Sequence, residues 1–175
     1  CDWSSDVCSS DLGRWAKRQG KPRIFGHRAG SDSVKAIIDT CARMQIEAVT
    51  LYAFSTENWK RPKAEVSGLM SMLKRVLKRE LDEVHGNNIR FQAIGDLHGL
   101  SPDVQKELAA ATEKTRNNTG MVLSVALNYG GRAEIVRAAR LAFQDIERRS
   151  DVIDHLSEAD IERNLYTHGL PEVDL

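Results

Sequence analysis

Residues 48–62 have the sequence AVTLYAFSTENWKRP, which predicts a strand, a polar loop and the start of a helix. The run 48–53 is apolar, β-branched and aromatic, as in a buried parallel strand. Pro62, with Glu65 and Val66 after it, predicts the first turn of a long helix. Polar groups at the carboxyl end of a strand lie where open α/β sheets bind ligands. This junction is therefore the first candidate for a functional site.

Strand and helix patterns alternate along the rest of the chain. The sequence predicts a helix from after Gly30 to about Gln45, a helix with one apolar stripe over 65–84, a strand over 89–94, a helix with Ser101 as N-cap, a strand over 121–126, a helix over 133–148 and a short helix from about Ser157. The crossovers are too long for hairpins, so we expect an α/β fold with a parallel β-sheet flanked by helices. We expect its first strand to be missing or replaced, because residues 1–12 have neither a strand nor a helix pattern.

Composition excludes several classes of protein. The 175 residues suit one domain, and 25 basic and 25 acidic residues give no net charge that would attract nucleic acid. The chain has no apolar run long enough to span a membrane and no basic, apolar leader, so we expect a cytoplasmic protein. The spacing of its three cysteines indicates neither disulfides nor structural zinc.

A second polar cluster lies at residues 13–30, GRWAKRQGKPRIFGHRAG. Six Lys and Arg residues and His27 alternate there with four glycines, and we interpret the segment as a basic loop. Glycine lets backbone N–H groups approach an anion, and arginine binds phosphate oxygens with two parallel hydrogen bonds, so the cluster suits a diphosphate. A solvated basic face is an equally good interpretation of charge alone. Neither standard nucleotide-binding motif is present.

Individual residues of these clusters also have structural interpretations. Asn58 could orient a substrate or a proton acceptor, but an asparagine before a helix is more often a cap. Trp59 could pack in a core, and Glu65 could interact with the dipole of its helix. The sequence NYGGR at 128–132 forms a third strand-end loop, whose glycines favour a turn over a ligand contact.

Several motifs together resemble the cis-prenyltransferases, most closely the bacterial undecaprenyl diphosphate synthases. The matching residues, in order from Gly13 to Leu175, are GRWA at 13–16, Arg23, Phe25-Gly26-His27, Gly30, LYAFSTENWKRP at 51–62 and NYGGR at 128–132. The resemblance implies an isoprenyl transferase that condenses isopentenyl diphosphate onto an allylic diphosphate, usually farnesyl diphosphate, with cis geometry. It also implies Mg2+, an apolar tunnel for the growing chain, a homodimer, and peripheral contact with the membrane that receives this cell-wall lipid precursor.

The resemblance assigns roles residue by residue. Gly13, Arg14, Arg23, His27 and Arg61 would hold the allylic diphosphate, Trp15 would guide substrate, and Ser55, Thr56 and Glu57 would line the pocket. Asn58 would be the catalytic residue that handles the departing proton. Trp59 and Glu65 would act in a segment that closes over the substrates.

The ends of the chain depart from the family pattern. The family's metal-binding Asp, which precedes Gly-Asn and Gly-Arg-Trp, falls on Ser10, and Asp11 is one place away. We therefore expect residues 1–12 to be a non-native segment, residues 13–175 to be a partial domain, and this chain to be inactive. The chain ends at Val173-Asp174-Leu175, which has the pattern of a starting strand, before the family's second substrate loop.

Two other function classes stay open. The first is a non-catalytic, diphosphate-binding partner subunit of the same fold, which would tolerate the loss of the aspartate. The second is a generic phosphate- or RNA-binding domain, which net neutrality and the lack of an aromatic stacking face disfavour.

Overall fold

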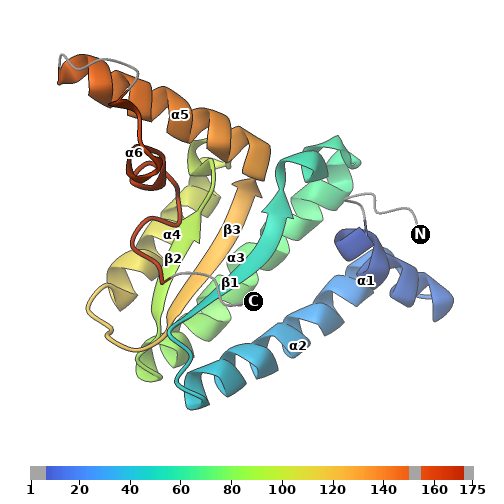
Figure 1. Ribbon diagram of the computed structural model, residues 1–175. Helices are drawn as coiled ribbons and strands as arrows, with labels where there is room; N and C mark the ends of the chain where they lie inside the picture. The colour runs from blue at the N-terminus through green and yellow to red at the C-terminus, as the bar shows by residue number, and fades with distance from the viewer. Residues whose placement is uncertain (1–6, 150–154, 172–175) are drawn as a thin grey trace.

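The computed structural model describes residues 7–149 and 155–171, without the side chains of residues 7–11, 23, 24, 27 and 28. The elements in chain order are α1 (Val7–Arg18), α2 (Arg23–Arg43), β1 (Ala48–Ser55), the 3-10 helix η1 (Thr56–Lys60), α3 (Lys63–Gly86), β2 (Arg90–Ile94), the 3-10 helix η2 (Leu97–Gly99), α4 (Pro102–Thr115), β3 (Val122–Tyr129), α5 (Gly131–Arg148) and α6 (Glu158–Glu162). The described strands form one sheet in the order β1-β3-β2 (Figure 1).

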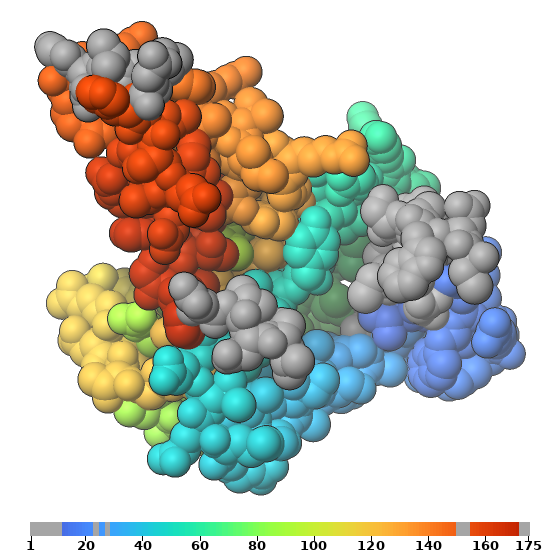
Figure 2. All heavy atoms as spheres, in the orientation of Figure 1, coloured from blue at the N-terminus to red at the C-terminus, as the bar shows by residue number. Residues whose placement is uncertain are grey.

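Both strand pairs are parallel, as the sequence predicts. Val122 of β3 lies opposite Ala48 on one side and Arg90 on the other, so the three strands start at the same level. Every residue of β3 from Val122 to Asn128 is buried, whereas β1 exposes Tyr52. In Figure 2 the side chains of β1, in cyan, are visible between the C-terminal segment in red and α1 and α2 in blue. The carboxyl ends of all three strands meet at one edge.

One face of the sheet carries the hydrophobic core. Leu123, Val125 and Leu127 of β3 pack there with Val104, Leu108 and Ala111 of α4, together with the apolar stripe of α3 and Ile38, Cys41 and Ala42 of α2. The stripe and the Ser101 N-cap agree with the sequence patterns. Both α2 and α3 run opposite to the strands (Figure 1), so both helices begin at the edge where the strands end. That edge is where parallel sheets gather their functional groups.

The structure corrects the interpretation of residues 13–30 as a loop. This segment is helical, because α1 continues to Arg18 and α2 begins at Arg23, well before the predicted start after Gly30. Gly20, at φ +67°, and Pro22 make the turn between the two helices. The prediction that residues 1–12 contain no helix is also wrong, since α1 begins at Val7. The strand predicted from Val173 lies outside the described residues.

Candidate functional site

The 3-10 helix η1 at the end of β1 holds Asn58 in a defined orientation. The backbone N–H of Ser55 donates to Asn58 Oδ1 at 3.1 Å, and the side chain of Ser55 accepts from the backbone N–H of Asn58, which completes a capping box. Asn58 is therefore part of a capping box, as the third residue of η1, whereas the N-cap itself is Ser55. Its Nδ2 group has no hydrogen-bond partner among the described residues. The amide thus has one end fixed by the backbone and a donor available to a ligand.

Trp59 connects η1 to two strands of the sheet, β1 and β3. Its indole ring lies edge-on to buried Phe54, with 5.0 Å between ring centroids. Its Nε1–H donates to Asn128 Oδ1 at 2.7 Å. Trp59 is 42% exposed, so part of its surface remains accessible. Thr56, two residues after β1's Phe54, lies directly against Gly130, where an added Cβ would come within 2.8 Å of the threonine hydroxyl.

Two acidic side chains of this segment have different surroundings. Glu57 is exposed, and hydrogen bonds from its own backbone N–H and the Ser55 hydroxyl lower the pKa of its carboxyl. Arg61 Nη1 donates to Glu65 Oε1 at 2.7 Å, and both side chains are less than one fifth exposed. Arg61 is therefore held by a carboxylate that a bound anion would have to replace. Arg61 lines a cavity of about 490 Å³ together with Trp59 of η1 and with Lys63 and other residues of α3.

The other predicted site residues lie on α1 and at the start of α2. Gly13 is buried, Arg14 is exposed, and Trp15 stacks on Phe25 with 6.2 Å between centroids. The side chains of Arg23 and His27 lie outside the described residues, so their expected contacts with diphosphate stay predictions. Figure 1 places α1 on the same side of the molecule as β1, away from α4.

The glycines of this segment have a structural use that the anion interpretation did not foresee. An added Cβ at Gly26 would lie 1.9 Å from the backbone oxygen of Leu12, and one at Gly30 would lie 2.9 Å from the Leu12 side chain. Ala16 is fully buried at the same contact. The absence of side chains at Gly26 and Gly30 therefore lets α1 and α2 approach each other closely.

An apolar cavity of about 170 Å³ lies between α2, α3 and the core face of the sheet. Its lining includes Val34 and Ile38 of α2, Leu73 and Leu77 of α3, and Leu51, Leu123 and Val125 of the strands. Lys35 of α2 forms ion pairs with Glu80 and Glu83 of α3 at its rim. These carboxylates raise the pKa of Lys35. The predicted stripe of α3 thus lines a cavity as well as a core.

A polar cavity of about 510 Å³ at the ends of β2 and β3 was not predicted from the sequence. Buried Glu134 accepts hydrogen bonds there from the Tyr129 hydroxyl at 2.5 Å and the Tyr166 backbone N–H at 2.7 Å. Burial and the Glu134 carboxylate raise the pKa of Tyr129 to about 12. The signal in the sequence was an acidic residue in the first turn of the helix that follows NYGGR at 128–132.

Comparison with known proteins identifies the family. A family model described as putative undecaprenyl diphosphate synthase matches residues 12–175. The chain belongs to this family. An isoprenyl transferase of Clostridium perfringens is 48% identical over 163 residues, which are 93% of this chain and 64% of that protein. A ditrans,polycis-undecaprenyl-diphosphate synthase ((2E,6E)-farnesyl-diphosphate specific) of Aliivibrio fischeri is 47% identical and covered to 63% of its length.

Two solved structures that are similar to this chain support the same family assignment. Lavandulyl diphosphate synthase from Lavandula x intermedia, in complex with dimethylallyl diphosphate, has a TM-score of 0.84 and 34% identity over 88% of this chain and 66% of that one. A probable undecaprenyl diphosphate synthase from Campylobacter jejuni has a TM-score of 0.67 and 33% identity over 77% and 62% of the two chains. The predicted family and the parallel α/β fold are therefore confirmed. The chain spans about 64% of the length of the curated relatives it matches.

The residues that the structure describes do not form a metal-binding site. Among them, no group of three or more His, Cys, Asp and Glu lies close enough to hold a metal ion. The side chain of Ser10, at the family's aspartate position, is outside the described residues. We therefore assign no step to Mg2+, and its use by the whole enzyme stays an expectation. No described helix is long and apolar enough to cross a membrane.

Proposed function

We propose that this chain is the allylic-substrate part of a cis-prenyltransferase. Its full-length form would condense isopentenyl diphosphate onto farnesyl diphosphate with cis geometry, giving a long-chain polyprenyl diphosphate. The observation that carries the proposal is the apolar cavity enclosed by α2, α3 and the sheet, whose helices both begin at the edge where β1 ends. Such a cavity suits a prenyl tail, because burial of apolar surface supplies most of the binding free energy of a hydrocarbon.

The proposed chemistry needs three contributions from the protein. The apolar cavity keeps water from the allylic carbon as its diphosphate leaves. Arg61, once it exchanges Glu65 for the diphosphate, stabilises the leaving charge, and Gly13, Arg14, Arg23 and His27 complete that subsite. Asn58 is too weak a base to take the proton alone, so its free Nδ2 group orients the acceptor while Ser55 holds Oδ1. Trp15, Ser55, Thr56 and Glu57 line the approach.

Binding to the chain itself tests this proposal directly. In titration calorimetry we expect farnesyl diphosphate to bind more tightly than either farnesol or inorganic diphosphate, because only the first has both a tail and an anion. Equal affinity for farnesol and farnesyl diphosphate would contradict the anion subsite. Equal affinity for inorganic diphosphate and farnesyl diphosphate would contradict the site for the prenyl tail. Steep, salt-dependent binding of RNA would instead support the phosphate-binding alternative.

We further propose that the present chain does not turn over, because Ser10 stands where the family has its aspartate. Incubation with farnesyl diphosphate, radiolabelled isopentenyl diphosphate and Mg2+ should give no long-chain product above background. Appreciable product would show this part of the proposal to be wrong. The native coding sequence upstream of Gly13 would distinguish an enzyme from a non-catalytic partner subunit. If it encodes Asp-Gly-Asn after a hydrophobic strand, the enzyme hypothesis is supported. The proposed homodimer and membrane-surface contact belong to the full-length protein.

A further inference from the structure

Asn128 lies where the three strand-end loops of the sheet meet. It is the penultimate residue of β3, it is 8% exposed, and its backbone is left-handed with φ +48°. Few residues other than glycine adopt that conformation, and asparagine is the commonest of them. Asn128 therefore combines a buried side chain with a backbone conformation that would be strained for most other residues.

The Asn128 amide uses both ends to join two loops. Oδ1 accepts the Trp59 indole N–H at 2.7 Å, and Nδ2 donates to the Asp96 backbone oxygen at 2.8 Å. Trp59 belongs to η1 after β1, and Asp96 precedes η2 after β2. A buried amide with both groups satisfied fixes the rotation of its partners, because any displacement leaves a buried polar group unpaired.

Glycines make room for this bridge. A Cβ at Gly99 would lie 2.5 Å from Asn128 Nδ2, and a Cβ at Gly130 would lie 2.8 Å from Thr56 Oγ1. Side chains at these two positions would push η2 away from Asn128 and η1 away from the loop after β3. The interlock is thus built from three separate stretches of the chain, which indicates that their relative position matters.

We propose that Asn128 is a positioning residue for the allylic site: it acts through Trp59 and sets the placement of η1, and with it the Asn58 amide. This inference rests on the proposed function, because it is through η1 that Asn128 would affect ligand binding. In this proposal Asn128 acts on the ligand only through Trp59. Residues 128–132 were predicted to form a turn, but Asn128 and Tyr129 end β3 and α5 begins at Gly131. The hydrogen bond from Trp59 gives Asn128 a role in the site.

The test replaces Asn128 by glycine, which accepts φ +48° without strain and removes only the amide. Asn88 provides a matched control, because it also has a left-handed backbone, at φ +57°. Its amide makes two hydrogen bonds to Thr119 in a neighbouring loop, away from the candidate site. Asn88→Gly therefore reproduces the general loss of stability without touching η1. Asn128→Asp keeps an oxygen for Trp59 and loses the donor to Asp96.

The first readout is the indole 15N–1H resonance of Trp59, assigned by its disappearance in Trp59→Phe. We expect this resonance to move in Asn128→Gly, to stay near its wild-type position in Asn128→Asp, and to be unchanged in Asn88→Gly. The second readout is calorimetric affinity for farnesyl diphosphate, which should fall about tenfold in Asn128→Gly and less than twofold in Asn88→Gly. In the Trp59→Phe background, Asn128→Gly should cause little further loss.

Two results would overturn the inference. The first is an indole resonance that does not respond to Asn128→Gly, and the second is equal loss of affinity in Asn128→Gly and Asn88→Gly. If Asn128→Gly does not fold, the affinities of Asn128→Asp and Trp59→Phe for farnesyl diphosphate are compared instead. The inference requires Asn128→Asp to bind more tightly than Trp59→Phe. Absence of farnesyl diphosphate binding in the wild-type chain would refute the proposed function, whereas the indole resonance would still decide whether Asn128 holds Trp59.

Discussion

Among single residues, Asn58 combines a structural and a chemical role in one amide. Its Oδ1 accepts the Ser55 backbone N–H and so caps η1, while its Nδ2 has no partner among the described residues. The two interpretations that the sequence left open are therefore compatible, because they use different atoms. Cap formation fixes the amide plane, and a fixed plane is what a group that orients a ligand requires.

We expect Asn58→Ala to lower the free energy of unfolding by about 1 kcal/mol, because it leaves the Ser55 N–H without its cap. Asn58→Asp keeps the oxygen acceptor and should cost only a few tenths of a kcal/mol. Urea unfolding followed by circular dichroism measures both values. Equal stability of the alanine and wild-type chains would contradict the capping role. Farnesyl diphosphate affinity, measured in parallel, should fall in both variants, because both lose the Nδ2 donor.

Arg61 gives a second prediction for a single residue. Its ion pair with Glu65 competes with any diphosphate for the same guanidinium. Glu65→Gln removes that competing charge, so the affinity for inorganic diphosphate should rise about twofold to fivefold, as for a partly exposed pair worth up to ~1 kcal/mol. Calorimetry at low and high salt measures the change, which should shrink at high salt. Weaker binding in Glu65→Gln would show that Glu65 holds Arg61 in its binding position.

Among secondary-structure elements, α3 and the part of α2 after Gly30 were predicted from the sequence, whereas α1 and the first turns of α2 were not. The stripe of α3 contacts the core along five turns, so its periodicity is visible in the sequence. The two earlier helices meet through Gly26, Gly30 and Ala16, whose small size carries no hydrophobic periodicity. A helix–helix contact built on glycine therefore looks like a loop in the sequence. Gly20 and Pro22 were the signals of the turn between them.

Replacing a helical glycine by alanine should change the free energy of unfolding in opposite directions at Gly26, in the α1–α2 contact, and at Gly86, outside it. Gly26→Ala places a Cβ 1.9 Å from the Leu12 backbone oxygen, so α1 must move and the free energy of unfolding should fall by about 1–3 kcal/mol. Gly86→Ala, at the end of α3, meets open space and should stabilise the chain by about 0.4–1 kcal/mol. Thermal unfolding of both variants measures the difference. Stabilisation by Gly26→Ala would show that α1 does not pack on α2 in solution.

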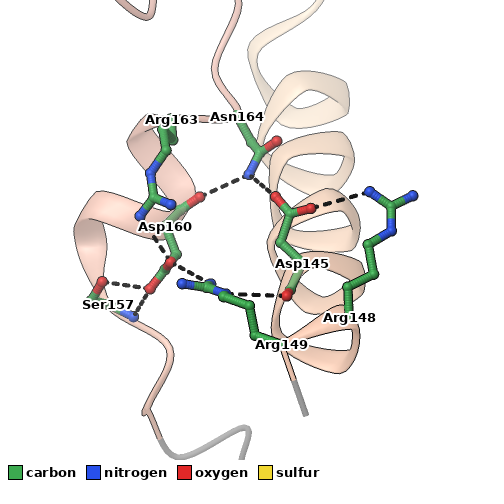
Figure 3. Close-up of polar contacts among 7 residues, drawn as sticks. All are labelled: Asp145, Arg148, Arg149, Ser157, Asp160, Arg163 and Asn164. Atoms are coloured by element: carbon green, nitrogen blue, oxygen red, sulfur yellow. Dashed lines mark hydrogen bonds and ion pairs between the residues drawn. The ribbon is translucent and has the colours of Figure 1, made fainter. Parts of the chain in front are cut away.

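The α5–α6 pair is held by a buried carboxylate (Figure 3). Asp160 is 6% exposed and accepts hydrogen bonds from the Ser157 hydroxyl at 2.6 Å, from Arg149 at 2.9 Å and from Arg163 at 3.0 Å. Asn164 donates to the Asp160 backbone oxygen at 3.0 Å and to Asp145 on α5 at 3.5 Å. Hydrogen bonds from Ser157 and Arg149 hold the pKa of Asp160 well below its usual range.

This depressed pKa fixes the sign of a pH effect. As the pH falls, Asp160 becomes protonated near pH 4 in the unfolded chain but only at lower pH in the folded chain. The contribution of ionised Asp160 to folding stability is therefore complete above about pH 4 and is lost as the pH falls below it. Asp160→Asn should lower the melting temperature at pH 7 and weaken the loss of stability in acid. Asp32→Asn, which removes an exposed carboxylate from α2, is the control. Identical acid profiles for Asp160→Asn and wild type would contradict this role of Asp160.

For the whole molecule, the sheet order β1-β3-β2 explains where the ligand site can lie. The sequence predicted parallel strands but not their order in the sheet. The length of a crossover indicates that the next strand is parallel, but not which strand it lies beside. β3 is apolar from Val122 to Leu127 except for Ser124, a pattern typical of a central strand buried on both faces. Contacts between distant segments, such as Trp59 with Asn128, depend on that order and could not be predicted from local patterns.

The apolar cavity between α2, α3 and the sheet gives the final prediction. Leu77→Trp places a larger ring in this cavity of about 170 Å³ and should reduce farnesyl diphosphate affinity at least tenfold, about 1.4 kcal/mol, while the affinity for inorganic diphosphate stays the same. Leu77→Met conserves volume and is the matched control. In the wild-type chain, affinity should rise from the C5 to the C15 diphosphate, because each buried methylene adds about 0.8 kcal/mol. Unchanged farnesyl diphosphate affinity in a folded Leu77→Trp chain would place the prenyl tail elsewhere.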